Sequence, residues 1–383
     1  MIWLGAEVVK APIAMRAPSA VAVRIAPQSA EVLAGAAASE LAGGRPDNAK
    51  ALAQDALARN PFNVTALRVW GLSEAEVGDP LAADSALTLA GNWSLRDTPT
   101  HAWLVQERLR AGDYASAFAH ADTLIRRRPS IYPPVFNLFS TAIRADGRAL
   151  AALKPLLVVD PPWREAYFSS LADRDDGDLP LAQLALALQA TESPFTSQEL
   201  SAAYVNWYNE GRLRLLERVR LDLKRPRLPP IIQNGDFEEA PGRAIPPFAW
   251  MLATTGGILS EVRKDDLDAN NMALRVNADS RVRTATASQI IMLEPGPATL
   301  SGSYRRETAI DAASLQWSII CLETQAVIAS YDLPEGPAGE WQRFSVPFTT
   351  PAGCSLAQVL LTTASSDRRV LATIWFDAVA IQG

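Results

Sequence analysis

The sequence predicts a multi-domain α + β chain, in which an all-α superhelix is followed by an antiparallel β-sandwich. Three observations lead to this fold class. Small residues and prolines recur at intervals of about 34 residues in the first half. The stretch LKRPRLPP (223–230) then ends the helical period. Beyond it, short β-rich runs alternate with Pro, Gly and Asp turns. With 383 residues, 48% of them hydrophobic, the chain is large enough for two or three domains with their own cores.

The repeat is clearest at small residues. Three glycines and three alanines recur at steps of 34 residues: Gly44, Gly78, Gly112, Ala49, Ala83 and Ala117. This period is typical of a repeated helix–turn–helix unit. Glycine at the turn allows a left-handed backbone, and proline at the end of a unit cannot continue a helix. We therefore expect left-handed glycine turns, and close helix contacts at Gly71 and the alanines.

These positions resemble the tetratricopeptide repeat family, whose pattern has a large residue then Gly in the first helix, a small Ala in the second and a final Pro. The matching residues are Trp70, Gly71, Gly78, Ala83 and Ala90, and in the preceding unit Gly44, Ala49, Ala56 and Pro61. Later steps, to Pro161 and Pro194, shorten to 32 and 33 residues. The resemblance implies about five or six helix pairs over residues 20–225 and a role in holding a protein partner.

Stacked repeats of this kind expose a concave face that holds a peptide, a helix or a neighbouring subunit. We expect polar residues of the first helix in each unit to line it: Arg68, Glu74, Gln106, Arg110, Asn137 and Asn206. The alternative is that these side chains are merely solvated. The aromatic residues Trp70, Trp103, Phe136 and Trp207 fit a helical core better than a ligand platform.

Residues 226–232 are predicted to form a stiff linker and residues 233–383 a sandwich, with residues 1–19 as a tail or the remnant of an anchor. Eight short β-rich runs follow one another at regular spacing, among them NMALRVNA, SLQWSIICLE and IWFDAVAIQ. This spacing favours an antiparallel sandwich, most simply a jelly roll.

The opening IIQNGDFEEAPGRAIPPFAW and the closing IWFDAVAIQG are similar to the jelly-roll carbohydrate-binding modules and their galactose-binding-like relatives. The resemblance implies a glycan ligand, although many such domains bind none. It also implies a structural calcium ion held by the matching acids Glu238 and Asp377, with Asp236 nearby, since carboxylate oxygens suit Ca²⁺. The alternative is that these residues make turn hydrogen bonds only. Otherwise no cofactor is predicted.

A sugar site needs exposed aromatic rings beside polar groups. The candidates are Tyr304, Arg305, Trp317, Tyr331 and Trp341. Each ring has the alternative of filling the core. Trp317 alternates in phase with Ile319 and Cys321, which allows it to face inward.

The two cysteines, Cys321 and Cys354, lie in or beside strands that could be neighbours. We expect a disulfide, which by closing 33 residues would contribute roughly 3 kcal/mol in the loop-entropy model. It would place the domain in an oxidising space such as the periplasm or cell envelope. Two buried thiols in a cytoplasmic protein are the alternative.

Several function classes are disfavoured. The net charge is −6 and the longest basic run is Arg126–Arg128, so nucleic acid is an unsuitable partner. No run reaches the ~18 apolar residues of a membrane span. Only two histidines occur, and nucleophile-elbow and P-loop motifs are absent from the sequence.

The sequence therefore favours a non-catalytic adaptor whose solenoid binds a protein and whose jelly roll binds a glycan, in bacterial exopolysaccharide or cell-envelope assembly. One alternative is a pure protein-interaction scaffold without a sugar ligand. The other is a glycan-processing enzyme, which requires two convergent carboxylates about 5–10 Å apart.

Overall fold

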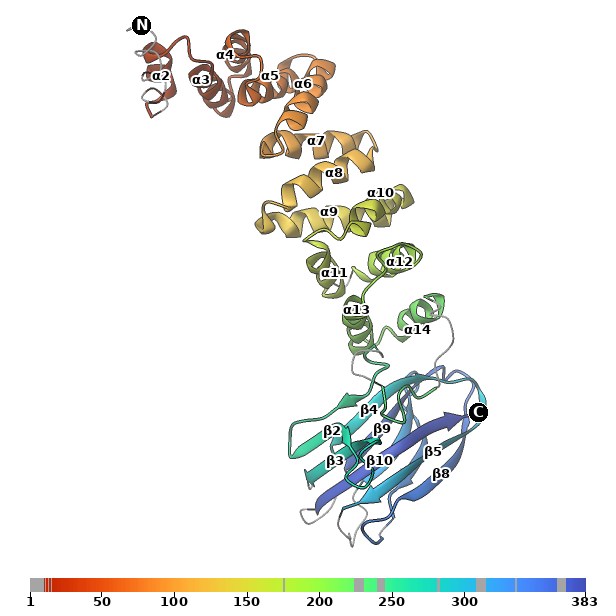
Figure 1. The fold of residues 1–383 in the computed structure, drawn as a ribbon. Coiled ribbons are helices and arrows are strands. Elements are labelled where there is room, and N and C mark those ends of the chain that lie inside the picture. Colours follow the sequence, from red (N-terminus) through yellow and green to blue (C-terminus); the bar gives the residue numbers. More distant parts are fainter. Residues whose placement is uncertain are drawn as a thin grey trace. The chain divides into compact units, whose positions relative to one another are not determined.

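The computed structural model describes residues 10, 12, 14, 16–174, 176–223, 231–239, 245–280, 283–307, 315–334, 336–363 and 370–383 (Figure 1). The chain divides into two compact units, Met1–Arg164 and Glu165–Gly383. The last helices thus group with the sandwich, although the predicted domain boundaries follow the change in secondary structure. Most of the predicted tail (residues 1–9, 11, 13 and 15) and linker residues 226–230 lie outside the described residues.

The first half is helical, as predicted. Within the described residues a short helix, α2 (Ser19–Ile25), precedes six helix pairs. The pairs are α3 (Ala30–Ala42) with α4 (Pro46–Arg59), α5 (Val64–Val77) with α6 (Pro80–Trp93), α7 (Thr98–Arg110) with α8 (Tyr114–Ile125), α9 (Tyr132–Ala145) with α10 (Gly147–Val158), α11 (Arg164–Ala172) with α12 (Asp178–Leu188), and α13 (Ser197–Asn209) with α14 (Leu213–Asp222). No helix among the described residues is long and apolar enough to cross a bilayer.

The turn glycines act in two different ways. Gly44 and Gly112 have φ of 70° and 71°, so their left-handed backbone is confirmed. Gly78 has φ −129°, and for this residue the expectation is wrong. A Cβ at Gly78 would lie 1.9 Å from Oε2 of Glu74, so any larger residue there would have to displace this buried carboxylate.

Close packing within the helix pairs is confirmed at the predicted small residues. A Cβ at Gly71 would lie 2.7 Å from Cγ of the buried Leu87 on α6. Ala49, Ala83 and Ala117 are fully buried, each on the second helix of its pair. Because an unbranched Cβ or none fills these positions, the paired helices can lie in direct contact.

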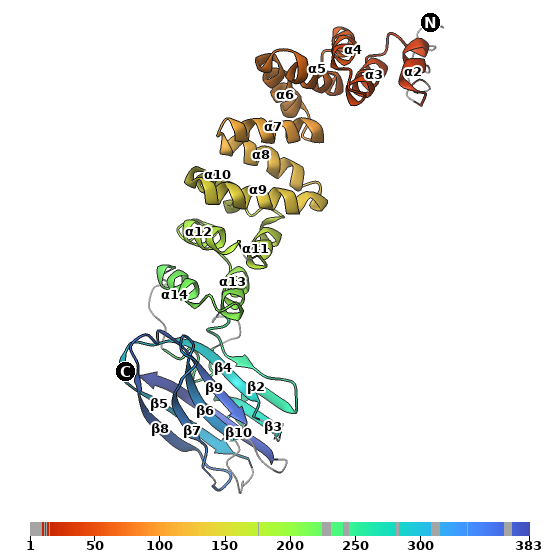
Figure 2. The same cartoon turned by 180° about the vertical axis from the view of Figure 1, so that it is seen from behind.

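The second half is a sandwich of two five-stranded antiparallel sheets (Figures 1 and 2). Sheet A has the order β1-β4-β9-β6-β7, and sheet B the order β2-β3-β10-β5-β8. The strands are β1 (Met251–Leu252), β2 (Ile258–Lys264), β3 (Met272–Ser280), β4 (Ala285–Met292), β5 (Gly296–Arg306), β6 (Leu315–Cys321), β7 (Val327–Asp332), β8 (Gln342–Thr350), β9 (Leu356–Thr363) and β10 (Val370–Gln382). The eight predicted runs became β3 to β10, whereas β1 and β2 were not among them.

The sandwich core lies between the two sheets. Leu274, Ile374 and Phe376 of sheet B face Trp317 and other apolar side chains of sheet A. Successive residues of a strand point to opposite faces. Trp375, between Ile374 and Phe376, therefore belongs to the outer face of sheet B.

Candidate functional site

The outer face of sheet B carries a row of three side chains across three neighbouring strands. In the strand register, Trp375 of β10 pairs with Arg275 of β3 on one side and with Arg305 of β5 on the other. Cross-strand partners share a face and lie within contact distance. The two arginines therefore flank the indole ring.

A second tryptophan extends this row toward solvent. The Arg305 guanidinium carbon lies 5.2 Å from the centre of the Trp375 ring and 5.6 Å from that of Trp341. The Arg275 guanidinium carbon is 5.9 Å from the Trp375 ring. All three separations are within the range of cation–π attraction. Trp341, which directly precedes β8, is thereby held beside strand β5.

Carboxylates neutralise the arginines. Arg305 is 3% exposed and pairs with the buried Asp265 at 2.7 Å and with the neighbouring Asp266. The same Asp265 accepts a hydrogen bond from Nε1 of Trp341 at 3.2 Å. The turn after β2 thus fixes both the cation and the ring, since a buried ion pair with added hydrogen bonds resists displacement.

At the other end of the row, Glu307 pairs with an arginine and a tryptophan in the same way as Asp265. Its carboxylate accepts hydrogen bonds from Arg275 Nε and from Trp375 Nε1, both at 2.8 Å. The hydrogen bond from Arg275 lowers the pKa of Glu307 below its ordinary value. This acid is therefore a charged structural partner at neutral pH.

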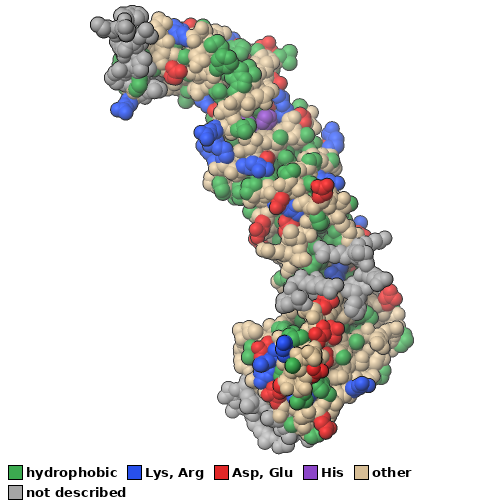
Figure 3. All heavy atoms as spheres, in the orientation of Figure 1, with side chains coloured by type: hydrophobic (Ala, Val, Ile, Leu, Met, Phe, Trp, Pro, Cys, Tyr) green, Lys and Arg blue, Asp and Glu red, His purple; other side chains and the backbone are tan. Residues whose placement is uncertain are grey.

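We call Trp341, Arg305, Asp265 and Asp266 the Trp341 patch. Trp341 is half-buried, and the Asp266 side chain is 57% exposed beside it. Nε of Arg305 is buried and has no hydrogen-bond partner within the described residues. Figure 3 shows acidic and basic side chains gathered on the sandwich face that Figure 1 presents. The patch combines a fixed aromatic ring with an accessible carboxylate.

Three of the five predicted sugar-binding residues lie elsewhere. Trp317 is fully buried in the core and Tyr304 is 2% exposed, so the expectation of exposed rings is wrong for both. The Tyr304 hydroxyl donates to Gln342 at 2.7 Å. Tyr331 is half-buried, with its ring stacked 5.3 Å from that of Phe344, and burial raises the pKa of its hydroxyl. Trp317 and Tyr331 both face the core of the sandwich, where they pack against other apolar side chains.

The acids predicted to hold calcium lie close to one another beside β10 (Val370–Gln382), the central strand of sheet B. Burial raises the pKa of Asp377, and the nearby charges of Asp236 and Glu238 raise it further. However, Asp377 accepts hydrogen bonds from Asn271 and Ala378, and Glu238 from Met272. Among the described residues, these three carboxylates do not form a cluster with all ligand oxygens within 4.8 Å. The acids suit Ca²⁺ chemically, but as placed they do not form a closed ligand set.

Three of the six predicted solenoid residues are held by internal contacts. Arg68 pairs with Asp97, and Asn206 donates to the Ala172 carbonyl. Glu74 is 6% exposed and pairs with Lys50 at 2.8 Å, and the hydrogen bond from Lys50 lowers its pKa.

The other three solenoid residues are exposed: Gln106, Arg110 and Asn137. Arg110 forms an ion pair with Glu107 at 3.0 Å. All three lie in the first compact unit, on the first helices of adjacent pairs, α7 and α9. Of the six predicted residues, these three are the ones with largely exposed side chains.

Cys321 and Cys354 form a disulfide with a Cα–Cα distance of 5.7 Å. It joins the end of β6 to the loop before β9, and both cysteines are buried. The bridge therefore fastens two neighbouring strands of sheet A at one end.

The sequence analysis assigned no role to Trp375, Arg275, Glu307 or Asp265. The run ATIWFDAVA is apolar on both sides of Trp375, so periodicity could not show which face the ring takes. A usable signal was present in β3, where the polar Arg275 and Asn277 alternate with the apolar Leu274, Val276 and Ala278.

No protein-family model matches the chain, and no curated protein matches it. Similar solved structures include the carbohydrate-binding module TmCBM61 in complex with β-1,4-galactotriose, which is 13% identical over 40% of this chain and 99% of that chain, with a TM-score of 0.28. A structure of Pseudomonas aeruginosa PilF is 15% identical over 58% of this chain and 91% of that chain, with a TM-score of 0.29.

A third similar structure is the enzymatically active domain of tailspike protein 4 from bacteriophage CBA120. It is 18% identical over 40% of this chain, with a TM-score of 0.29, and the match spans only 21% of the tailspike chain. The neighbours thus include both kinds of protein that the sequence resembles, tetratricopeptide-like proteins and carbohydrate-binding modules.

Proposed function

We propose that this chain is a non-catalytic binding protein whose sandwich recognises a glycan at the Trp341 patch. The observation that carries the proposal is the fixed position of Trp341. Its indole nitrogen is hydrogen-bonded to Asp265 and its ring contacts Arg305, while Asp266 stands exposed beside it. An aromatic face beside a carboxylate suits a sugar, which presents C–H groups to the ring and hydroxyl donors to the acid.

The charges of the patch favour a neutral glycan. Arg305 is the one cation of the patch, and it is already paired with two carboxylates. The remaining charge of the patch is negative, and it lies mainly on the exposed Asp266. An acidic polysaccharide would therefore meet repulsion there, whereas the hydroxyl groups of a neutral sugar can donate to the carboxylate.

The same pairing argues against a glycan-processing role for these acids. A hydrolase needs two carboxylates that act from opposite sides of one glycosidic bond. Asp265 and Asp266 are adjacent in sequence and both bind Arg305. We infer that they orient the ring and the ligand.

We propose further that the solenoid binds a protein, and a specific surface favours this. The rings of Phe62 and Trp93 contact each other with centroids 5.4 Å apart, yet they are 74% and 42% exposed. Exposed apolar side chains that form a group are typical of interaction sites. If the sandwich has no sugar ligand, this surface still supports the alternative of a protein scaffold.

We also propose a cellular compartment for the protein and a calcium ion bound to the sandwich. The disulfide suits an oxidising space, which for a bacterial protein is the periplasm or cell envelope, and exopolysaccharide or envelope assembly would join a protein machine to a glycan. Calcium at Asp236, Glu238 and Asp377 would neutralise neighbouring acids and link the segment before the sandwich to the central strand β10.

A glycan array with the full chain tests the sugar proposal. The expected result is saturable binding to neutral glycans, lost in W341A and kept in W93A, which removes an exposed tryptophan from the solenoid. Absence of binding to every neutral and acidic glycan would eliminate the sugar ligand for those classes. Binding that survives W341A would place the site elsewhere.

A further inference from the structure

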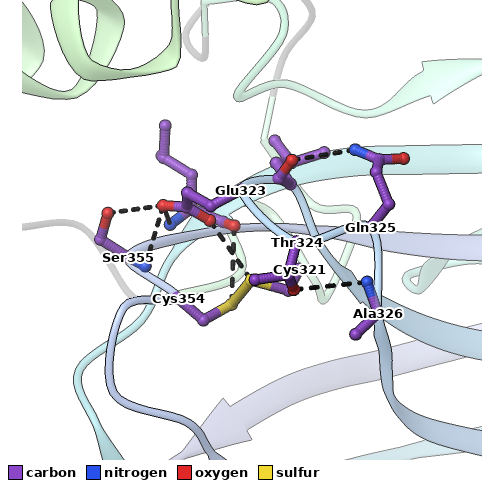
Figure 4. The surroundings of a disulfide bond; sticks show 9 residues. Cys321, Glu323, Thr324, Gln325, Ala326, Cys354 and Ser355 are labelled. Carbon is purple, nitrogen blue, oxygen red and sulfur yellow. Dashed lines mark hydrogen bonds between the residues drawn. A yellow bond between two sulfur atoms is a disulfide. The ribbon is translucent and has the colours of Figure 1, made fainter.

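The turn after β6 and the loop before β9 bring two sulfurs and one carboxylate together. Ligand atoms of Cys321, Glu323 and Cys354 all lie within 4.8 Å of one another. Both cysteines are at most 1% exposed, whereas Glu323 is exposed. Figure 4 shows the Glu323 carboxylate between the Ser355 side and the disulfide. A buried sulfur pair therefore has an acidic group at its solvent side.

The two oxygens of Glu323 have different surroundings. Oε1 accepts three hydrogen bonds, from Ser355 N at 3.0 Å, Ser355 Oγ at 2.7 Å and Leu356 N at 2.9 Å. Oε2 lies 3.3 Å from Sγ of Cys321 and has no other partner within the described residues. A disulfide sulfur has no hydrogen to donate. The carboxylate is thus fixed through one oxygen while the other faces a sulfur that cannot satisfy it.

We propose that, once the disulfide is reduced, these three residues bind a divalent transition metal such as Zn²⁺. Cys321 and Cys354 would supply thiolates, Glu323 Oε2 a carboxylate oxygen, and water the fourth ligand. Tetrahedral zinc with Zn–S near 2.3 Å and Zn–O near 2.0 Å separates sulfur and oxygen by about 3.5 Å. The observed 3.3 Å is close to that value.

The sulfur pair also fits this geometry. The same zinc would hold its two sulfurs about 3.8 Å apart. With Cα atoms 5.7 Å apart, the cysteines can reach that separation by side-chain rotation. The hydrogen bonds to Oε1 orient the carboxylate in advance, as outer partners do at other metal sites.

Metal binding first requires reduction of the Cys321–Cys354 disulfide, for which a dithiol reductant supplies the electrons and protons. Transfer of two electrons and two protons from the dithiol converts the disulfide to two thiols and oxidises the dithiol to its own disulfide. Each thiol then releases its proton when it binds the metal. Metal and disulfide are mutually exclusive, and both close the same 33-residue segment. The metal would thus replace the covalent link in a reducing compartment. This proposal does not depend on glycan binding.

Cobalt absorption of the full chain tests the site. The reduced chain, freed of reductant without air, is titrated with Co²⁺ alone. We expect one equivalent to give a thiolate-to-cobalt charge-transfer band and the intense visible bands of tetrahedral cobalt, both displaced by Zn²⁺. C354S should abolish them, and E323Q should weaken cobalt binding by about tenfold or more. The matched control E340Q removes an exposed acid outside the site and should bind like wild type.

Four outcomes would overturn the proposal. The first is the absence of the charge-transfer band in a reduced chain that keeps its sheet circular dichroism. The second is sheet structure that is lost on reduction and not restored by zinc. The third is E323Q binding cobalt as tightly as wild type. The oxidised chain must remain without these bands, and their presence there would also contradict the proposal.

Discussion

The Arg305 guanidinium carbon lies 5.6 Å from the centre of the Trp341 ring, and this contact fixes a loop residue to a central part of sheet B. On its other side the same guanidinium faces Trp375 at 5.2 Å. A half-exposed ring is therefore positioned by a residue that is itself buried. Such preorganisation lowers the entropy cost of binding.

Arg305→Met should destabilise the sandwich. It leaves the buried carboxylate of Asp265 without its cation, and loss of one partner of a buried pair costs about 3–5 kcal/mol. Hydrogen exchange of β3, β5 and β10 peptides in the full chain should accelerate, while helical peptides stay unchanged. Arg343→Met removes an exposed arginine from β8 and serves as the control. Equal exchange in the two variants would contradict this role for Arg305.

The solenoid should lose stability in mild acid because of a histidine pair. Nδ1 of His101 and Nδ1 of His120 lie 3.0 Å apart. Burial lowers the pKa of both, and that of His120 falls to about 4, with the nearby His101 and Arg108 contributing. The unfolded chain titrates near 6.5 and so binds more protons between these values, which makes stability fall as pH falls through the window.

The test is the melting temperature of the helical signal at pH 7 and pH 5. Wild type should melt earlier at pH 5, and His120→Gln should show a smaller difference between the two pH values. An identical pH response in the variant would show that the pair does not control it.

Gly71→Ala should destabilise the solenoid by about 1–3 kcal/mol, because its Cβ would lie 2.7 Å from the buried Leu87. Gly35→Ala is the matched control on α3. A Cβ at Gly35 meets nothing within 4 Å, so alanine should stabilise that helix by about 0.5–1 kcal/mol. Thermal melts of both variants should move in opposite directions. A shift of the same sign would refute the close-packing explanation.

Calcium should raise the melting temperature of the sandwich if it bridges the converging acids. The chelator-treated chain is melted with and without Ca²⁺, and Asp377→Asn should lose the response because it removes a ligand charge. Asp332→Asn changes a β7 acid bound to Gln316, and it should keep the response. A wild-type melting temperature that ignores calcium would end the calcium proposal.

The solenoid was readable from sequence because its contacts are local. Gly71 and Ala83 mark packing within one helix pair, and their spacing along the chain reports it directly. Gly78 shows the limit of that reasoning. The pattern located the glycine, but the reason for it lies in Glu74, whose burial depends on Lys50 from a neighbouring pair.

The candidate site was only partly readable. Trp341 and Arg305 were identified, but their partner Asp265 lies 40 residues before Arg305 and 76 before Trp341. Contacts between residues this far apart in the sequence depend on the order of strands in the sheet. The alternation of side chains along one strand does not predict that order. For Trp317, the alternation with Ile319 and Cys321 pointed to the core, and this alternative is the one that the structure has.

Calorimetric titration of the full chain with a neutral oligosaccharide from the array tests the central claim most directly. Wild type, W341A and the control W93A are compared at equal concentration. W341A should bind at least about tenfold more weakly than wild type, a loss of ~1.4 kcal/mol, while W93A binds like wild type. An unchanged Kd in a folded W341A would contradict the assignment of the glycan site to the Trp341 patch.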